Sequence, residues 1–208
     1  MERAYEAMLQ MLVDEGYLKN PAHLEAFRKI KRADFLPADA EIEAGINAPL
    51  PIGEGQTISQ PLTVAFMLDL LDPQPGQEIL DVGSGSGWTT AMLAHLVGPK
   101  GKVYGLARLS GLYEFGKRNI AKYTFSNVEL VCRDGSLGLP QRAPFDRIQV
   151  AAAAREIPKP LLEQLAVGGR MVIPTQKDDL RLVIRKSAKN YETKIFPGFV
   201  FVPLIEKK

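Results

Sequence analysis

The fold of this chain is decided by the stretch Leu80-Asp81-Val82-Gly83-Ser84-Gly85-Ser86-Gly87-Trp88. A strand-like run, 78–82, leads into it, and a helical pattern over 89–97 follows it. Glycines at such a junction let the backbone turn sharply and approach a ligand closely. We therefore expect a nucleotide-type cofactor at this strand–helix crossing. The alternative is a glycine-rich turn that binds nothing.

The spacing of the glycines separates two classes of cofactor. A dinucleotide site of the G-x-G-x-x-G type needs a third glycine at position 88, where this chain has Trp88. The pattern Asp-x-Gly-x-Gly-x-Gly, from Asp81 to Gly87, instead resembles motif I of the class I methyltransferases. That resemblance implies S-adenosylmethionine as the cofactor and S-adenosylhomocysteine as the product. The cofactor-binding residues expected in this turn are Asp81, Gly83, Ser84, Gly85 and Gly87; an ordinary turn acid is the alternative for Asp81.

Helix and strand patterns alternate along the chain after Pro61. Strands are expected over 78–82, 102–106, 128–132, 146–151 and 170–173, with helices over 61–71, 89–97, 112–122 and 160–165. Such alternation predicts an α/β fold, a doubly wound and mostly parallel sheet with helices on both faces. The stretches 180–185 and 191–196 predict an antiparallel C-terminal hairpin, and Phe199–Leu204 predicts one more strand.

The chain is expected to form one domain, 1–208, in three parts. Residues 1–45 carry two helical patterns, the second opened by Asn20-Pro21, and form an N-terminal helical extension. Residues 46–60 are rich in Gly, Pro and Asn and predict a long loop, which in a compact domain is usually functional or disordered. The apolar residues Ile46, Leu50, Ile52 and Ile58 argue against disorder. Residues 61–208 form the Rossmann-like core and the C-terminal strands.

The composition of the chain argues against several kinds of partner and site. The 208 residues hold 26 Lys and Arg against 24 Asp and Glu, a net charge of +2, which indicates neither nucleic acid nor an anionic membrane as a partner. Two histidines and one cysteine give no zinc spacing, so no metal is expected. Cys132 follows an apolar run and is expected to be a buried structural thiol. No stretch reaches ~18 apolar residues, and we expect a cytoplasmic monomer.

Further segments sharpen the resemblance to one methyltransferase family. The most specific is Pro51-Ile52-Gly53-Glu54-Gly55-Gln56-Thr57-Ile58-Ser59-Gln60-Pro61. With Asp134-Gly135-Ser136-Leu137-Gly138, Ala143-Pro144-Phe145-Asp146, Gly168-Gly169-Arg170 and Phe201-Val202-Pro203-Leu204, it resembles the protein-L-isoaspartate (D-aspartate) O-methyltransferases over nearly the whole chain. The resemblance makes 46–60 a substrate loop.

The family resemblance implies methyl transfer from S-adenosylmethionine to the carboxylate of L-isoaspartyl residues in damaged peptides or proteins. The ester then collapses to a succinimide, which gives a repair cycle. A carboxylate is ionised at pH 7, so it needs no strong general base. Thr57 and Ser59 are the expected catalytic residues, although Ser59 also suits a helix N-cap. Asp134, with Gly135 beside it, is expected to recognise the adenine amino group.

Three positions depart from the family pattern. Ala107 stands where an acidic residue would hydrogen-bond the cofactor ribose. Gly45 lies where the family has an aromatic residue and an acid nearby, and Ala151 lies where it often has threonine. An active enzyme with a rearranged ribose contact and a non-catalytic binding protein both remain open. Arg108 could also bind a 2′-phosphate, against which the glycine spacing counts.

Overall fold

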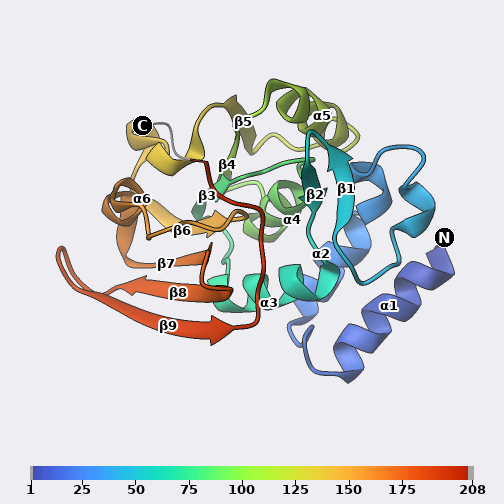
Figure 1. The fold of residues 1–208 in the computed structure, drawn as a ribbon, viewed down its shortest axis with the longest axis horizontal. Helices are drawn as coiled ribbons and strands as arrows, with labels where there is room; N and C mark the ends of the chain where they lie inside the picture. The colour runs from blue at the N-terminus through green and yellow to red at the C-terminus, as the bar shows by residue number, and fades with distance from the viewer. Residues whose placement is uncertain (1, 206–208) are drawn as a thin grey trace.

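The computed structural model describes residues 2–205 and places a seven-stranded sheet at the centre of the molecule (Figure 1). Its strands are β3 (Glu78–Val82), β4 (Lys102–Ala107), β5 (Val128–Cys132), β6 (Phe145–Val150), β7 (Leu165–Thr175), β8 (Asp179–Arg185) and β9 (Tyr191–Pro197). The strand order is β5-β4-β3-β6-β7-β8-β9, and the first five strands are parallel. β8 and β9 pair antiparallel at the other edge. The mostly parallel sheet with an antiparallel C-terminal hairpin is therefore confirmed.

Alternate residues of the central strands enter two separate apolar cores, one on each face of the sheet. Ile79 and Val103 belong to the core that also contains residues of α3 (Pro61–Leu71), α4 (Trp88–Val97) and α5 (Ser110–Ile120). Their neighbours Leu80 and Tyr104 belong to the other core, which includes Leu161 of α6 (Lys159–Gln164). Because side chains alternate along a strand, helices on both faces require strands that are apolar throughout. The fold is doubly wound, as predicted.

The N-terminal extension is built into the first of these cores. It comprises α1 (Glu2–Asp14), α2 (Pro21–Lys29) and the 3-10 turns η1 (Arg32–Phe35) and η2 (Glu41–Glu43). Leu9 and Leu12 of α1 are fully buried there. The Asn20 side chain caps α2 by accepting a bond of 2.9 Å from the backbone N–H of Ala22, which confirms the predicted helix start.

Two segments differ from the prediction. The expected loop 46–60 contains a hairpin of β1 (Leu50–Gly53) and β2 (Gln56–Ile58). The segment Phe199–Leu204 was predicted to be a strand and is not one. It makes a single isolated bridge between Ala153 and Pro203, with hydrogen bonds that join Ala153 to Val202 and Leu204, the residues on either side of Pro203. The residues of this segment are partly buried or exposed, so its apolar character did not indicate pairing along a ladder.

Cys132 is exposed, so its prediction as a buried thiol was wrong. β5 is an edge strand with a neighbour on one side only, and its residues Val128–Val131 are only partly buried.

The 3-10 turns η3 (Gly135–Leu137) and η4 (Pro140–Arg142) lie between β5 and β6. No helix within residues 2–205 has the length and apolarity needed to cross a membrane.

Candidate active site

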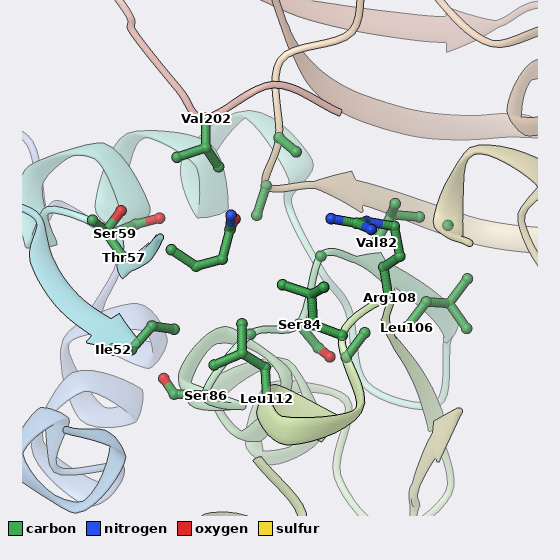
Figure 2. A pocket seen from close by; sticks show the side chains of 18 of the residues that line it. Ile52, Thr57, Ser59, Val82, Ser84, Ser86, Leu106, Arg108, Leu112 and Val202 are labelled. Carbon is green, nitrogen blue, oxygen red and sulfur yellow. The ribbon is translucent and has the colours of Figure 1, made fainter. Parts of the chain in front are cut away.

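A cavity opens where β3, β4 and β6 end, beneath the β1–β2 hairpin. Open α/β sheets bind ligands at the carboxyl ends of their strands. The space free of protein atoms in it is about 930 Å³, part of which is open solvent at its mouth. Figure 2 shows Thr57, Ser59 and Ile52 on one side of the cavity and Ser84, Leu106 and Arg108 on the other. Substrate-loop and cofactor-turn residues thus face one space.

The glycine turn forms the floor of this cavity. Gly83, Ser84 and Gly85 line it, and both glycines adopt positive φ, +85° and +52°. Gly87, also at positive φ, is not among the lining residues. An added Cβ at Gly87 would lie 3.0 Å from Ile120 of α5. Its role in this structure is close packing of the turn against a helix.

Asp81 lies beneath the turn instead of in the cavity wall. Its side chain is fully buried and accepts hydrogen bonds from the hydroxyls of Thr90 at 2.6 Å and Thr89 at 3.3 Å. Burial raises the pKa of this carboxyl to about 6, against the opposing effect of its hydrogen bonds. Asp81 therefore ties the end of β3 to the first turn of α4. The sequence suggests two roles for Asp81, a cofactor contact and an ordinary turn acid. A buried link between β3 and α4 is a third role, which it does not suggest.

Asp134 and Gly135 follow β5 at the rim of the cavity. Gly135 lines it, and a Cβ there would lie 2.5 Å from Cγ1 of Val82, so only glycine fits this close approach. Oδ1 of Asp134 accepts from the backbone N–H and the hydroxyl of Ser136, at 2.9 and 2.8 Å. These bonds fix the carboxylate beside Gly135, but the cavity lining does not include Asp134. Its predicted adenine contact stays a prediction.

Thr57 and Ser59 both line the cavity from the hairpin side. Gln60, and not Ser59, is the N-cap residue of α3, so the capping interpretation of Ser59 was wrong. The proline at the first helical position shifts the cap to Gln60 directly before it. Ser59 is therefore available for a ligand.

The three positions that depart from the family pattern, Ala107, Ala151 and Gly45, lie in different surroundings. Ala107 is buried at the end of β4 and lines the cavity next to Arg108. Ala151 also lines it, and its Cβ would be 3.6 Å from a Cβ placed on Gly83. Gly45 lies outside the cavity against α1, where a Cβ would approach the backbone of Ala4 to 2.8 Å. Gly45 is thus a packing requirement of the extension.

Several lining residues were not predicted. Gln56, Leu109 and Leu112 belong to this group, as do the C-terminal residues Val202–Ile205, which cross the cavity from the far end of the chain. Figure 2 shows Val202 projecting toward the space opposite Leu112. The Phe201-Val202-Pro203-Leu204 motif was a usable signal for this group, although it was interpreted as a strand.

The residues of the cavity fit an amino-acid nucleoside such as S-adenosylmethionine. The Gly83–Gly85 turn has positions where only backbone meets the ligand, at the start of α4, where helix N–H groups favour an anionic carboxylate. Val82, Leu106 and Leu112 supply apolar walls suited to a base. The fit is incomplete at the ribose, because Ala107 offers no acceptor.

Comparisons with known proteins agree with this geometry. The family model of protein-L-isoaspartate (D-aspartate) O-methyltransferase matches residues 3–208. A relative of that name from Methanothermobacter thermautotrophicus is 40% identical and covers 96% of this chain and 94% of its own. One from Ignicoccus hospitalis is 41% identical over 100% of both chains.

A solved structure extends the likeness to three dimensions. It comes from Plasmodium falciparum and is described as a protein-L-isoaspartate O-methyltransferase in complex with S-adenosyl-L-homocysteine. It is 25% identical, has a TM-score of 0.88, and covers 98% of this chain and 99% of its own. The chain therefore belongs to the protein-L-isoaspartate (D-aspartate) O-methyltransferase family.

Proposed function

We propose that this protein transfers a methyl group from S-adenosylmethionine to the carboxylate of L-isoaspartyl residues in damaged proteins or peptides. The observation that carries the proposal is the shared cavity. Its floor is the glycine turn Gly83–Gly85, and its opposite wall holds the hydroxyls of Thr57 and Ser59. Donor and acceptor groups can therefore meet inside one space, as direct transfer requires.

The chain's own residues have a limited task in this reaction. The bound cofactor supplies an electrophilic methyl group on a positively charged sulfur. The substrate carboxylate is already ionised, so Thr57 and Ser59 only donate hydrogen bonds that orient one of its oxygens. Ile52 lies over the turn, 3.4 Å from a Cβ placed on Gly85, and helps to exclude water. The methyl ester leaves through the open mouth.

Substitutions at the two hydroxyls test this assignment. Ser59→Ala and Thr57→Val are each expected to lower kcat for an isoaspartyl peptide about tenfold or more, because orientation of the nucleophile is lost. Affinity for S-adenosylhomocysteine should change less than about threefold. Ser59→Ala should also leave the free energy of unfolding within about 0.5 kcal/mol, because Ser59 does not cap α3.

The controls separate the possible outcomes. The same peptide with a normal aspartyl residue measures background methylation, and Ser187→Ala, in the exposed turn after β8, controls for removal of a hydroxyl. Unchanged turnover in both cavity variants would remove Thr57 and Ser59 from the mechanism. A wild-type protein that binds S-adenosylhomocysteine by calorimetry but methylates no isoaspartyl peptide would be a binding protein.

We also propose that the protein works as a monomer in the cytoplasm. The monomeric state is the part of this proposal that can be tested directly. Light scattering at micromolar concentration tests it, and a dimeric mass would contradict it.

A further inference from the structure

Arg32 is a fully buried cation beside the active site that the proposed reaction does not use. It begins η1, and its side chain has no exposed surface. Burial lowers the pKa of its guanidinium to about 10, which leaves it charged at neutral pH. Burial of a charge is costly unless its surroundings compensate. Its contacts therefore need an explanation.

The guanidinium donates to four backbone carbonyls, three of them in the substrate loop and one, that of Ala44, just before it. Nη1 donates to the carbonyls of Ala44 at 3.2 Å and Ile46 at 2.8 Å. Nη2 donates to Ala48 at 2.7 Å and to Ser59 at 3.1 Å. The acceptors span residues 44–59, so one side chain joins both ends of the loop. Arginine carries five N–H donors spread over a planar fork, whereas lysine has three donors on a single nitrogen, so lysine could not reach all four carbonyls.

Arg32 also contacts the cofactor side of the site. Its guanidinium lies over the Trp88 ring, 5.4 Å from the centroid. Trp88 is the first residue of α4, lines the cavity, and donates from its indole to the carbonyl of Ile30 at 3.1 Å. The Arg32 side chain itself is not part of the cavity wall. It therefore touches both the loop that carries Ser59 and the helix that follows the glycine turn.

We propose that Arg32 is a positioning residue that holds the substrate loop, and Ser59 at its end, in place against the cofactor turn. The inference deepens the proposed function and rests on it. A displacement of reacting groups by about 1 Å can cost on the order of a hundredfold in rate. Loss of the clamp should therefore affect turnover more than cofactor binding.

Arg32→Lys tests the proposal, with Arg147→Lys as its matched control. Arg147 is also buried and donates to two backbone carbonyls, of Asp72 and Asp146, but it lies at the start of β6, at the other end of the sheet. Both variants should lose stability. Only Arg32→Lys should lower kcat about tenfold or more, with affinity for S-adenosylhomocysteine changed less than about threefold.

Hydrogen exchange supplies a readout that is independent of turnover. The backbone amides of residues 46–60 should exchange at least about tenfold faster in Arg32→Lys than in wild type. In Arg147→Lys their exchange rates should equal those of wild type. Equal effects of the two variants on turnover, or a uniform rise in exchange, would overturn the proposal. If the wild type shows no methyl transfer, the proposed function fails, but the exchange comparison still decides the role of Arg32.

A second variant keeps the test valid if Arg32→Lys does not fold. Asn47 provides another tie of the loop, because its Oδ1 accepts from the backbone N–H of Leu62 at 3.0 Å. If Arg32 is the dominant clamp, Asn47→Ala should leave exchange of residues 48–60 within about threefold of wild type. A larger increase would show that Asn47, and not Arg32, holds the loop.

Discussion

Ala107 is a small side chain at the position where an acceptor would be most useful. It lies buried at the end of β4 in the cavity wall, where a cofactor ribose would be bound. Its methyl group can accept no hydrogen bond. A hydrogen bond from a ribose hydroxyl to a carboxylate typically contributes about 1.5–3 kcal/mol.

Ala107→Glu should therefore strengthen cofactor binding. The expected gain is roughly 1–2 kcal/mol, or about five- to thirtyfold in Kd for S-adenosylhomocysteine, because the new side chain must also be ordered and desolvated. Isothermal calorimetry on both proteins measures it. Ala107→Gln is the control for size. Equal affinities in all three proteins would mean that another group already satisfies the ribose.

Arg108 limits how large this gain can be. Its guanidinium lines the same cavity and could pair with the new carboxylate. An exposed pair of this kind contributes little by itself and is screened by salt. The measured gain in affinity should therefore increase as the salt concentration is raised from 0.05 to 0.5 M, relative to the Ala107→Gln control, on the order of twofold.

At the scale of elements, the contact between α5 and the glycine turn sets the shape of the cavity floor. Gly116 of α5 lies against this turn, where an added Cβ would be 2.9 Å from the carbonyl oxygen of Gly85. The obstacle is backbone, so either the helix or the turn must move.

Gly116→Ala should therefore damage both stability and cofactor binding. We expect a loss of about 1–3 kcal/mol in the free energy of unfolding, and roughly tenfold weaker binding of S-adenosylhomocysteine as the turn is displaced. Denaturant titration and calorimetry measure the two effects.

Gly111→Ala in the same helix is the control for this substitution. A Cβ at Gly111 would meet the end of the flexible Glu54 side chain, which can rotate away. Gly111 is not at positive φ, and replacing such a glycine by alanine typically stabilises a protein by about 0.4–1 kcal/mol. Stability should therefore hold or rise there. If the Gly116→Ala and Gly111→Ala proteins had the same free energy of unfolding, the contact between α5 and the glycine turn would not be tightly packed.

The β1–β2 hairpin shows why some elements escaped sequence-based prediction. Its tip, Gly53-Glu54-Gly55, has three successive residues at positive φ, and a non-glycine residue among them is unusual. Its strands are short, and Pro51 lies in one of them. An alternation of apolar and polar residues can be recognised only over a longer run than these strands provide, so the sequence predicts a loop here. The core strands were predictable because each is a continuous apolar run bounded by turn residues.

At the scale of the whole molecule, the sequence predicted only part of the set of residues that lines the cavity, because Asp81, Gly87 and Asp134 were expected in the site and are not among the lining residues. Gly83 lies in the cavity because the strands of a parallel sheet end at one edge, and the separate β1–β2 hairpin brings Thr57 and Ser59 to the same cavity. Asp81 was expected to contact the cofactor, directly or through water, and nothing in a single sequence shows that its side chain is buried and bonded to the hydroxyl of Thr90. The path of the C-terminal segment was equally hidden, because it depends on one distant bridge at Ala153.

The buried Asp81 should impose a pH dependence on the stability of the whole protein. Its pKa is raised to about 6 in the folded protein, from 3.8. The folded state therefore binds the proton more tightly, and this contribution to stability is present below about pH 4 and is lost as the pH rises through about 6. Such a shift corresponds to roughly 3 kcal/mol. Relative to wild type, Asp81→Asn should gain on the order of this amount between pH 4 and 7.

Asp179 supplies a control of opposite sign. Burial acts to raise the pKa of Asp179, but hydrogen bonds from Arg181 and Thr175 outweigh it and hold the pKa below its usual value. Asp179→Asn should therefore lose stability relative to wild type as the pH rises from about 3 to 5. Urea titrations from about pH 3 to pH 7 measure both differences. Parallel curves for Asp81→Asn and wild type would mean that Asp81 titrates normally.

The exposed edge strand β5 makes the protein convenient for site-specific chemistry. Cys132 is the single cysteine of the chain, and it pairs in register with Ala107, at the cavity wall. A thiol-reactive fluorophore would therefore attach at one defined place without any engineered cysteine. Trp88, the single tryptophan, is buried beside the same cavity. Trp88 can thus serve as the fluorescence donor, and an acceptor dye can be attached at Cys132. Resonance energy transfer between them would follow ligand entry into the cavity.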